Sequence, residues 1–250
     1  PFVADSVMYI PLAISVWFLA QVPKPNEADK LDRVERLPMD KSARKAFIKE
    51  FGIGLVLFII SYVLLTAYRE FRDNFMPEIL QELGYGGQTA LFTKTEIPIA
   101  VVVLLLMASM RLIRNHAKAF FVIQSLLLLG ASIIGASTLL YQLEIINPIL
   151  WLIGVGFGAY VAYSMCNSIY FERMLAAFKY SGTVGFMITL ADYYAYFGSL
   201  LVLFYKNFFQ NKTTNVNFFI YGSYALAATY FLMVLASFYY FERKTSNTKK

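Results

Sequence analysis

The chain has 250 residues, of which 58% are hydrophobic and 15% are charged, and its net charge is +6 at pH 7. Soluble domains are about 45–50% apolar and about 25% charged, so this composition excludes an ordinary soluble domain. The chain contains one cysteine and one histidine, which excludes a disulfide framework and a site of clustered histidines. We therefore expect no metal ion, no cofactor and no catalytic group. In a membrane protein the excess of basic residues does not indicate a nucleic-acid partner.

Seven apolar runs follow one another along the chain, and each is close to or above the roughly 20 residues that a helix needs to cross a bilayer. The runs are Phe2–Val22, Phe47–Leu80, Gln88–Ile113, Ala117–Tyr141, Pro148–Phe178, Gly182–Tyr205 and Val216–Phe241. This pattern predicts an all-α polytopic membrane protein with seven transmembrane helices, one helix followed by a bundle of six. The lipid bilayer is then the environment of most of the chain.

Polar segments divide these runs into four regions. We expect a transmembrane helix at residues 1–22, a cytoplasmic linker loop at 23–49, a six-helix bundle at 50–241 and a cytoplasmic tail at 242–250. The linker, the tail and the connections after the third and fifth runs are all basic. With seven spans these segments fall on one side, which the positive-inside rule assigns to the cytoplasm. The prediction is a multi-pass protein of the inner (plasma) membrane with a cytoplasmic C-terminus.

The second run continues directly into a charged stretch, Tyr68–Asn74, which holds four charges. No Gly or Pro separates this stretch from the apolar residues before it, and the next helix-breaking residue is Pro77. The helix is therefore expected to continue through the charges, which then lie in the outer half of the membrane. Charged groups there are costly and usually functional. The alternative is that these side chains end the helix at the water interface and are solvated.

Further charges open the third run, at a similar depth on the adjacent antiparallel helix. Each isolated charge at the bilayer centre costs about 2.5–3.5 kcal/mol, so we expect a paired network that faces the protein interior. Its members are Arg69, Arg72 and Lys94 against Glu70, Asp73 and Glu96, with Asn74 beside them. We predict that this network binds a substrate or gates its path, and the basic groups favour an anionic or zwitterionic small molecule.

Asp192 lies near the middle of the sixth run and has no basic residue within one helical turn. Tyr193 and Tyr196 flank it and carry hydroxyl groups that donate hydrogen bonds. Removing a carboxylate from water favours its protonated form, so Asp192 with these tyrosines is a candidate proton-coupling site. The alternative is a structural aspartate that accepts a hydrogen bond from a tyrosine or pairs with one of the arginines.

The fifth run carries polar residues toward its cytoplasmic end. Glu172 and Arg173 form an adjacent pair, which serves either as an interfacial anchor or as a gate contact. Asn167 lies deeper in the same run and is expected to line a cavity. The spaced glycines from Gly154 to Gly158 indicate close helix packing, because no strand precedes them and the run is apolar.

One span, a basic loop and six further spans resemble the sixth helix, the central loop and the C-terminal half of a major facilitator superfamily transporter. The connection Arg111–His116 matches a cytoplasmic loop of that superfamily by position, although it lacks the acidic residue and the glycines of the superfamily's signature loop. The resemblance implies two six-helix halves, built from inverted repeats, that rock around a site near the midplane. Because the chain opens on Pro1, we expect the N-terminal half to be its missing partner.

Three shorter stretches, Tyr62–Phe75, Thr95–Pro98 and Phe171–Met174, are similar to an uncharacterised bacterial membrane family known only as a domain of unknown function. That family implies no substrate. The resemblances imply a secondary active transporter that moves a small solute by alternating access, with a proton as candidate coupling ion, and not an enzyme. The alternatives are a seven-helix receptor or a non-transporting membrane scaffold. A retinal receptor is disfavoured because Val216–Phe241 contains no lysine.

Overall fold

The computed structural model describes residues 2–21, 39–209 and 213–248 of the chain. The chain divides into two units, Pro1–Glu35 and Arg36–Lys250. In the first unit Phe2–Ala20 form a helix, α1, within the first apolar run. Residues 23–38 of the predicted linker lie outside the described residues. The last part of that linker is not a loop, because the next helix already begins at Lys41.

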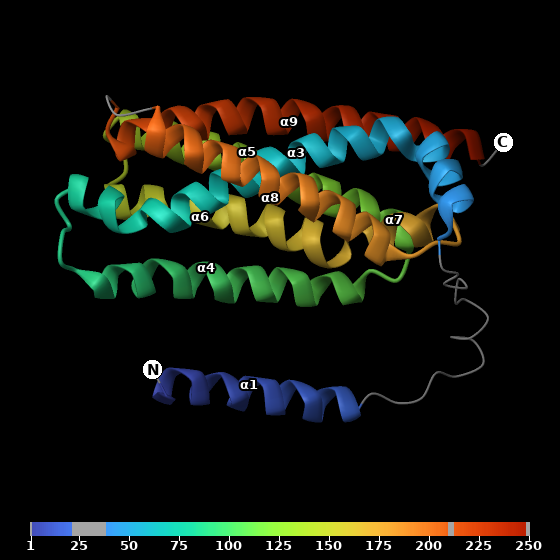
Figure 1. The fold of residues 1–250 in the computed structure, drawn as a ribbon, viewed down its shortest axis with the longest axis horizontal. Helices are drawn as coiled ribbons and strands as arrows, with labels where there is room; N and C mark the ends of the chain where they lie inside the picture. The colour runs from blue at the N-terminus through green and yellow to red at the C-terminus, as the bar shows by residue number, and fades with distance from the viewer. Residues whose placement is uncertain (1, 22–38, 210–212, 249–250) are drawn as a thin grey trace. The chain divides into compact units, whose positions relative to one another are not determined.

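The described residues of the second unit contain six long helices (Figure 1). They are α3 (Lys41–Glu82), α4 (Thr89–Ser109), α5 (His116–Gln142), α6 (Pro148–Met165), α8 (Val184–Phe208) and α9 (Asn215–Thr248). Helix α6 continues through a π-helical segment, η2 (Cys166–Tyr170), into α7 (Phe171–Ala177), and a short 3-10 turn, η1 (Met110–Leu112), follows α4. With α6 to α7 taken as one, the described residues contain 6 helices long and apolar enough to cross a membrane, and no strand. The all-helical, multi-pass class is confirmed, and the seven-span arrangement stays a prediction.

Short polar side chains and glycines set the ends of these helices. Asp40, Asn115 and Asn147 each precede a helix and accept the backbone N–H three residues further on, at 2.7, 2.9 and 2.9 Å. Such N-caps satisfy one of the free N–H groups of a first helical turn. The turn between α3 and α4 contains Gly84 and Gly87 with φ of 86° and 79°, a left-handed conformation that favours glycine.

Helix α3 is 42 residues long and runs without interruption through the charged stretch Tyr68–Asn74. The prediction that the helix continues through the charges is confirmed. Pro77 lies inside the helix and does not end it. The predicted polar tail is also helical, since α9 extends to Thr248, and Lys244 pairs there with Glu50 of α3.

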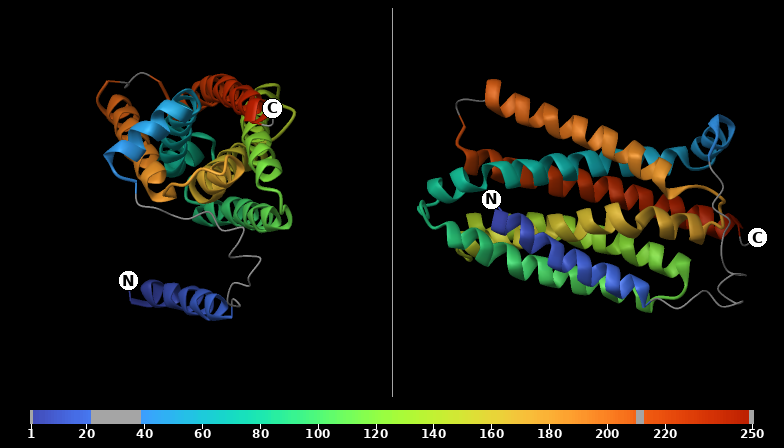
Figure 2. Two further views of the ribbon diagram at one scale, coloured as in Figure 1. Left: turned by 90° about the vertical axis from the view of Figure 1, so that its right-hand side faces the viewer. Right: turned by 60° about the horizontal axis from the view of Figure 1, so that its bottom comes forward.

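The six helices pack in an ordered pattern, seen end-on in the left view of Figure 2. Helix α3 packs against α8 and α9, α6 packs against α4 and α5, α5 packs against α9, and α3 touches α6. The pattern is twofold: if α3 is exchanged with α6, α4 with α8 and α5 with α9, the same pairs of helices remain in contact. Consecutive spans alternate in direction, so the two members of each exchanged pair run antiparallel. Helices α4 and α8 are the least buried of the six spans.

Aromatic rings fill the core where α3, α5, α7 and α9 meet. Phe58 stacks on Tyr170 with ring centroids 4.2 Å apart, and the edge of Phe120 packs against Phe241 at 5.1 Å. Gly54 of α3 permits the close approach of α9, because a Cβ atom there would lie 2.5 Å from the Phe241 ring. Small residues in membrane helices allow contacts of this kind.

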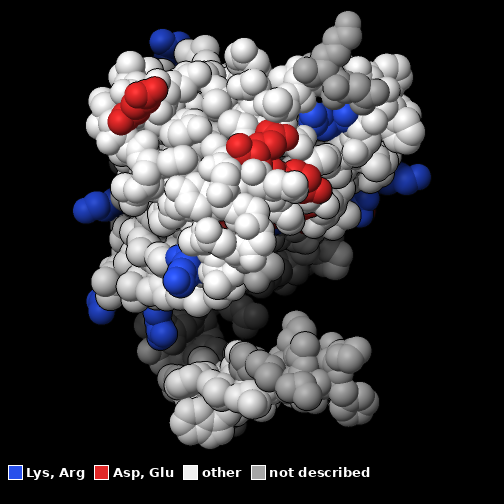
Figure 3. Space-filling model, turned by 90° about the vertical axis from the view of Figure 1, so that its left-hand side faces the viewer, with Lys and Arg blue, Asp and Glu red and all other residues white. Residues whose placement is uncertain are grey.

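Basic side chains gather at the end of the bundle where α3 begins and α9 finishes. They include Arg44, Arg111, Lys118, Lys179 and Arg243. At the opposite end the turns at 83–87 and 142–147 contain no Lys or Arg. Figure 3 looks onto that end and shows a mainly uncharged surface, with acidic groups near its centre and upper left and basic groups mostly toward its margin. The asymmetry is consistent with the predicted orientation, which stays a prediction.

Candidate functional site

A line of polar side chains runs along the contact between α3 and α6, and we call it the polar seam. On α3 it consists of Tyr62, Thr66, Arg69 and Asp73, which lie at helical spacings of four, three and four and so share one face. On α6 it consists of Tyr160 and Tyr163, three residues apart on the facing surface. Helices α4 and α8 add Glu96 and Asp192 at the sides of the seam.

Arg72 is the most buried charged group of the seam region, with 0% of its surface exposed. Its Nη2 donates to Glu96 Oε1 at 2.6 Å and its Nη1 lies 3.3 Å from Asp73 Oδ1. The guanidinium also lies 5.7 Å from the centre of the Tyr160 ring. A buried charge is tolerated only when it is paired and hydrogen-bonded, so these contacts are the reason that Arg72 can be enclosed. The ion pair with Glu96 also ties α3 to α4.

Gly156 of α6 makes the space that the Arg72 guanidinium occupies. A Cβ atom at this position would lie 2.7 Å from Arg72 Nη2 and 2.7 Å from Ile99 Cδ1. The spaced glycines from Gly154 to Gly158 predict close helix packing. That interpretation fits Gly158, where a Cβ would lie 2.6 Å from a backbone oxygen of α5. At Gly156 the missing side chain accommodates a charged group instead.

Arg69 and Asp73 form the middle of the seam. The Arg69 guanidinium lies over the Tyr163 ring, 4.0 Å from its centre, and donates to Glu70 Oε1. Its other terminal nitrogen is 3.9 Å from Asp73, the i, i+4 contact that the sequence predicts. Asp73 in turn accepts the Tyr160 hydroxyl, which lies 2.9 Å from each carboxylate oxygen. Tyrosines of α6 therefore hold both charged groups of α3 by hydrogen bonding and by cation–π contact.

The hydrogen-bond partner of Asp192 on α8 lies on the neighbouring helix α3 and not on α8 itself. The Tyr62 hydroxyl donates to Asp192 Oδ1 at 2.9 Å, and the Tyr62 ring stacks on Tyr163 with centroids 5.8 Å apart. Tyr193 and Tyr196, which were expected to donate to Asp192, are 68% and 56% exposed, and neither has a hydrogen bond to Asp192 in the described structure. Helical rotation explains the difference for Tyr193, because side chains one residue apart point in different directions. Tyr196 lies one turn from Asp192 on the same side of α8, and its side chain is exposed.

Two of the predicted network residues lie at its edge. Lys94 is exposed, and no carboxylate of the described residues lies within ion-pair distance of it. Asn74 is also exposed, and its Nδ2 donates to the Glu70 backbone carbonyl at 2.7 Å. The expectation that three basic groups face three acidic groups is therefore wrong for Lys94, because only Arg69 and Arg72 pair with these acids in the described structure.

The predicted polar residues near the end of the fifth span lie away from the seam. Arg173 donates to the backbone carbonyls of Met110 and Ile113 at 3.2 and 3.4 Å, and it contacts His116 Nδ1 at 3.1 Å. Arg173 therefore ties α7 to the turn between α4 and α5, and its role as an interfacial anchor or a gate contact stays a prediction. Glu172 beside it is exposed, and Asn167 lies in η2.

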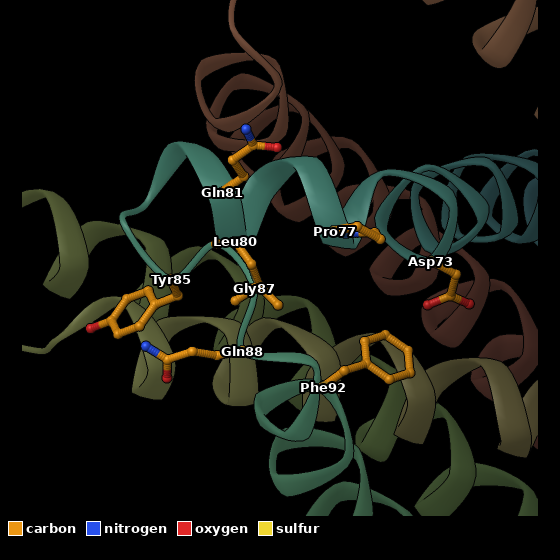
Figure 4. Close-up of a pocket in the computed structure, with 9 residues that line it drawn as sticks. Asp73, Pro77, Leu80, Gln81, Tyr85, Gly87, Gln88 and Phe92 are labelled. Carbon is orange, nitrogen blue, oxygen red and sulfur yellow. The ribbon is translucent and has the colours of Figure 1, made fainter.

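A pocket of about 670 Å³ opens beside the seam, between the end of α3 and the start of α4 (Figure 4). Its lining consists of Asp73, Pro77, Leu80, Gln81, Tyr85, Gly86, Gly87, Gln88 and Phe92. Asp73 is the one charged residue in this lining, and Figure 4 shows its carboxylate and the Phe92 ring at the same end of the opening. The volume lies within the range of small-molecule sites.

Gln124 of α5 is a second polar feature, and sequence reasoning missed it. The residue is fully buried, and neither atom of its side-chain amide has a hydrogen-bond partner among the described residues. It borders an internal cavity of about 10 Å³ with Ser61, Cys166 and Tyr230, which is close to the space of one water molecule. The signal was available, since a lone amide in an apolar run is unusual. Tyr160 and Tyr163 were missed because tyrosine is frequent throughout the chain.

The fold and the seam define the class as an all-helical, multi-pass membrane protein with paired charged groups, Arg72 and Glu96 among them, within the helix bundle. No group of three His, Cys, Asp or Glu in the described ranges is placed to hold a metal ion. Residues 1–244 match a family described as a family of unknown function (DUF5690), and the chain belongs to that family. Comparison with the curated proteins and with the solved structures returned no match.

Proposed function

We propose that the chain is the C-terminal part of a secondary transporter with the architecture of the major facilitator superfamily. The proposal rests on the twofold packing pattern of the six helices. The first three spans of the bundle and the last three have equivalent neighbours and opposite directions. Inverted repeats of this kind are typical of transporters, whose sites lie at the interface of the repeats. Helices α3 and α6 are the equivalent pair that meets at such an interface, and the polar seam lies between them.

The partial exposure of the seam supports a second half that covers it. The side chains of Arg69, Glu70, Asp73 and Glu96 remain 14%, 27%, 29% and 23% exposed. Hydrocarbon cannot satisfy such groups, whereas a protein surface or a water-filled path can. In the proposed architecture the N-terminal half lies against α4 and α8, and the seam faces the path between the two halves.

The roles of the residues follow from their contacts. The Arg72–Glu96 pair is the fixed element, because Arg72 is enclosed and Glu96 joins it from a second helix. Asp192 is the candidate for proton coupling, because its one hydrogen-bond partner among the described side chains is the neutral Tyr62 hydroxyl. Rocking of the halves would change the access of water to Asp192.

Uptake into proteoliposomes tests the proposal. The intact protein is reconstituted, and solutes taken up under an imposed pH gradient are identified by mass spectrometry. We expect gradient-driven uptake that Asp192→Asn abolishes, while Glu78→Gln, a matched change at an exposed position of α3, leaves it unchanged. Absence of uptake for every solute class, with the protein folded in the vesicles, would contradict the proposal.

A further inference from the structure

The charges of the seam do not balance, and their pairing shows where the excess lies. The cluster on α3 and α4 contains two guanidinium groups, Arg69 and Arg72, and three carboxylates, Glu70, Asp73 and Glu96. Each arginine has one close carboxylate, Glu70 for Arg69 and Glu96 for Arg72. Asp73 is the remaining acid, at 3.3 and 3.9 Å from the two arginines. The cluster thus has one negative charge in excess, and Asp73, whose contacts with the arginines are the longest, is the acid whose charge is least compensated.

No other charged group near the cluster offsets this excess. Lys94 is exposed and has no ion pair in the described structure, and α6 contributes the uncharged hydroxyl of Tyr160. On α8 the nearest charged side chain of the seam is Asp192, which is also acidic. A net negative charge in an environment of low dielectric constant attracts a cation.

The pocket beside the seam has the composition of a cation site. Asp73 is 29% exposed and borders it, the amides of Gln81 and Gln88 supply neutral polar groups, and no Lys or Arg lines it. Phe92 and Tyr85 supply aromatic rings, whose faces attract ammonium groups.

We propose that this pocket binds a small organic ammonium compound, with the charged nitrogen at Asp73 and the apolar body against Phe92, Pro77 and Leu80. The inference rests on the proposed function, because it names the substrate class of the same path. It replaces the anionic or zwitterionic substrate expected from the sequence, since the arginines are occupied by Glu70 and Glu96.

Ligand-induced thermal stabilisation of the purified intact protein tests this proposal. The probes are choline and butylammonium, with 3,3-dimethyl-1-butanol as a neutral compound of the shape of choline and 3,3-dimethylbutanoate as the anion. We expect a concentration-dependent rise in melting temperature with an ammonium probe and none with the other two. Asp73→Asn should weaken the apparent affinity about tenfold, since it removes the negative charge that attracts the ammonium group. Phe92→Ala should weaken it roughly three- to tenfold.

The controls separate a binding defect from a folding defect. Phe92 is 41% exposed, so its truncation leaves the packing of the bundle intact, and Glu78→Gln removes a carboxylate of α3 that does not line the pocket. Stabilisation by the anion, equal stabilisation by the neutral compound, or no response to either ammonium probe would each overturn the proposal. Uptake of an anion would overturn the ammonium inference and leave the transporter proposal standing. A wrong substrate class is therefore distinguishable from a protein that transports nothing.

Discussion

Replacing Gly156 by alanine tests whether the Arg72 guanidinium is held where the structure places it. The added Cβ would lie 2.7 Å from Arg72 Nη2 and 3.0 Å from Arg72 Cζ, well inside van der Waals contact. A flexible side chain would move away, but Arg72 is fully buried and bonded to Glu96 at 2.6 Å. The guanidinium must therefore shift against its ion pair.

Two opposing effects set the magnitude. Alanine in a helix interior is favoured over glycine by roughly 0.5–1 kcal/mol. Overpacking a well-packed site costs about 1–3 kcal/mol, and weakening a buried ion pair adds to that cost. We expect Gly156→Ala to destabilise the protein by about 1–2 kcal/mol, measured as a lower melting temperature in detergent. Gly52→Ala is the matched control, because the nearest atom to its Cβ is 3.9 Å away, and it should be neutral or stabilising.

A double-mutant cycle shows whether the effect passes through the ion pair. In a Glu96→Gln background the guanidinium is already released from its strongest contact, so Gly156→Ala should cost clearly less than in the parent protein. If the two changes are additive within about 0.5 kcal/mol, or if Gly156→Ala stabilises the parent, the reasoning about Arg72 is refuted.

Further predictions concern the Arg72–Glu96 pair, the hydrogen bond from Tyr62 to Asp192 and the helix cap at Asp40. Glu96→Gln should destabilise by roughly 3–5 kcal/mol because it leaves the buried Arg72 without its closest partner, Arg72→Met should cost less because Glu96 is partly exposed, and the double variant should cost less than their sum in thermal unfolding. Tyr62→Phe removes the hydrogen bond to Asp192 and should cost about 1–2 kcal/mol, with the pH dependence of uptake altered; unchanged pH dependence would argue against coupling at Asp192. The backbone N–H of the first turn of α3, together with the Ser42 hydroxyl, lowers the pKa of Asp40. The cap is therefore fully present above about pH 4 and is lost as the pH falls through the lowered pKa, which hydrogen exchange of the first turn will show; Asp40→Asn should remove this pH dependence.

The path of α3 was predictable because its signals are local. From Leu55 the apolar run passes without Gly or Pro directly into Tyr68–Asn74, and the helix continues as expected. The i, i+4 spacing of Arg69 and Asp73 also follows from helix geometry alone. Other features depend on partners far along the chain. The hydrogen bond from Tyr62 to Asp192 spans 130 residues, and no periodicity indicates it.

The charge balance of the site was not predictable for a similar reason. Lys94 and Glu96 are two residues apart on α4, so they lie on different sides of the helix. The packing of α4 against α6 turns Glu96 toward Arg72 and leaves Lys94 exposed. Sequence spacing restricted both residues to α4, but tertiary packing decided which one joined the network. That choice changes the expected substrate from an anion to a cation.

Cysteine accessibility at Thr66 tests the central claim, that the polar seam lines a path opened alternately to the two sides of the membrane. Thr66 lies on the seam face of α3, is 1% exposed, and its hydroxyl has no hydrogen-bond partner in the described structure, so cysteine replaces it with little loss. The background carries Cys166→Ser, which removes the native thiol. Ser237→Cys on α9 is the buried control outside the seam.

Membrane-impermeant thiol reagents are applied separately to right-side-out and inside-out vesicles that contain the intact protein. We expect Thr66→Cys to be labelled from both sides, and Ser237→Cys to stay unlabelled. An imposed pH gradient should change the labelling rates from the two sides in opposite directions. Labelling of Thr66→Cys from neither side, or from one side under every condition, would contradict the account.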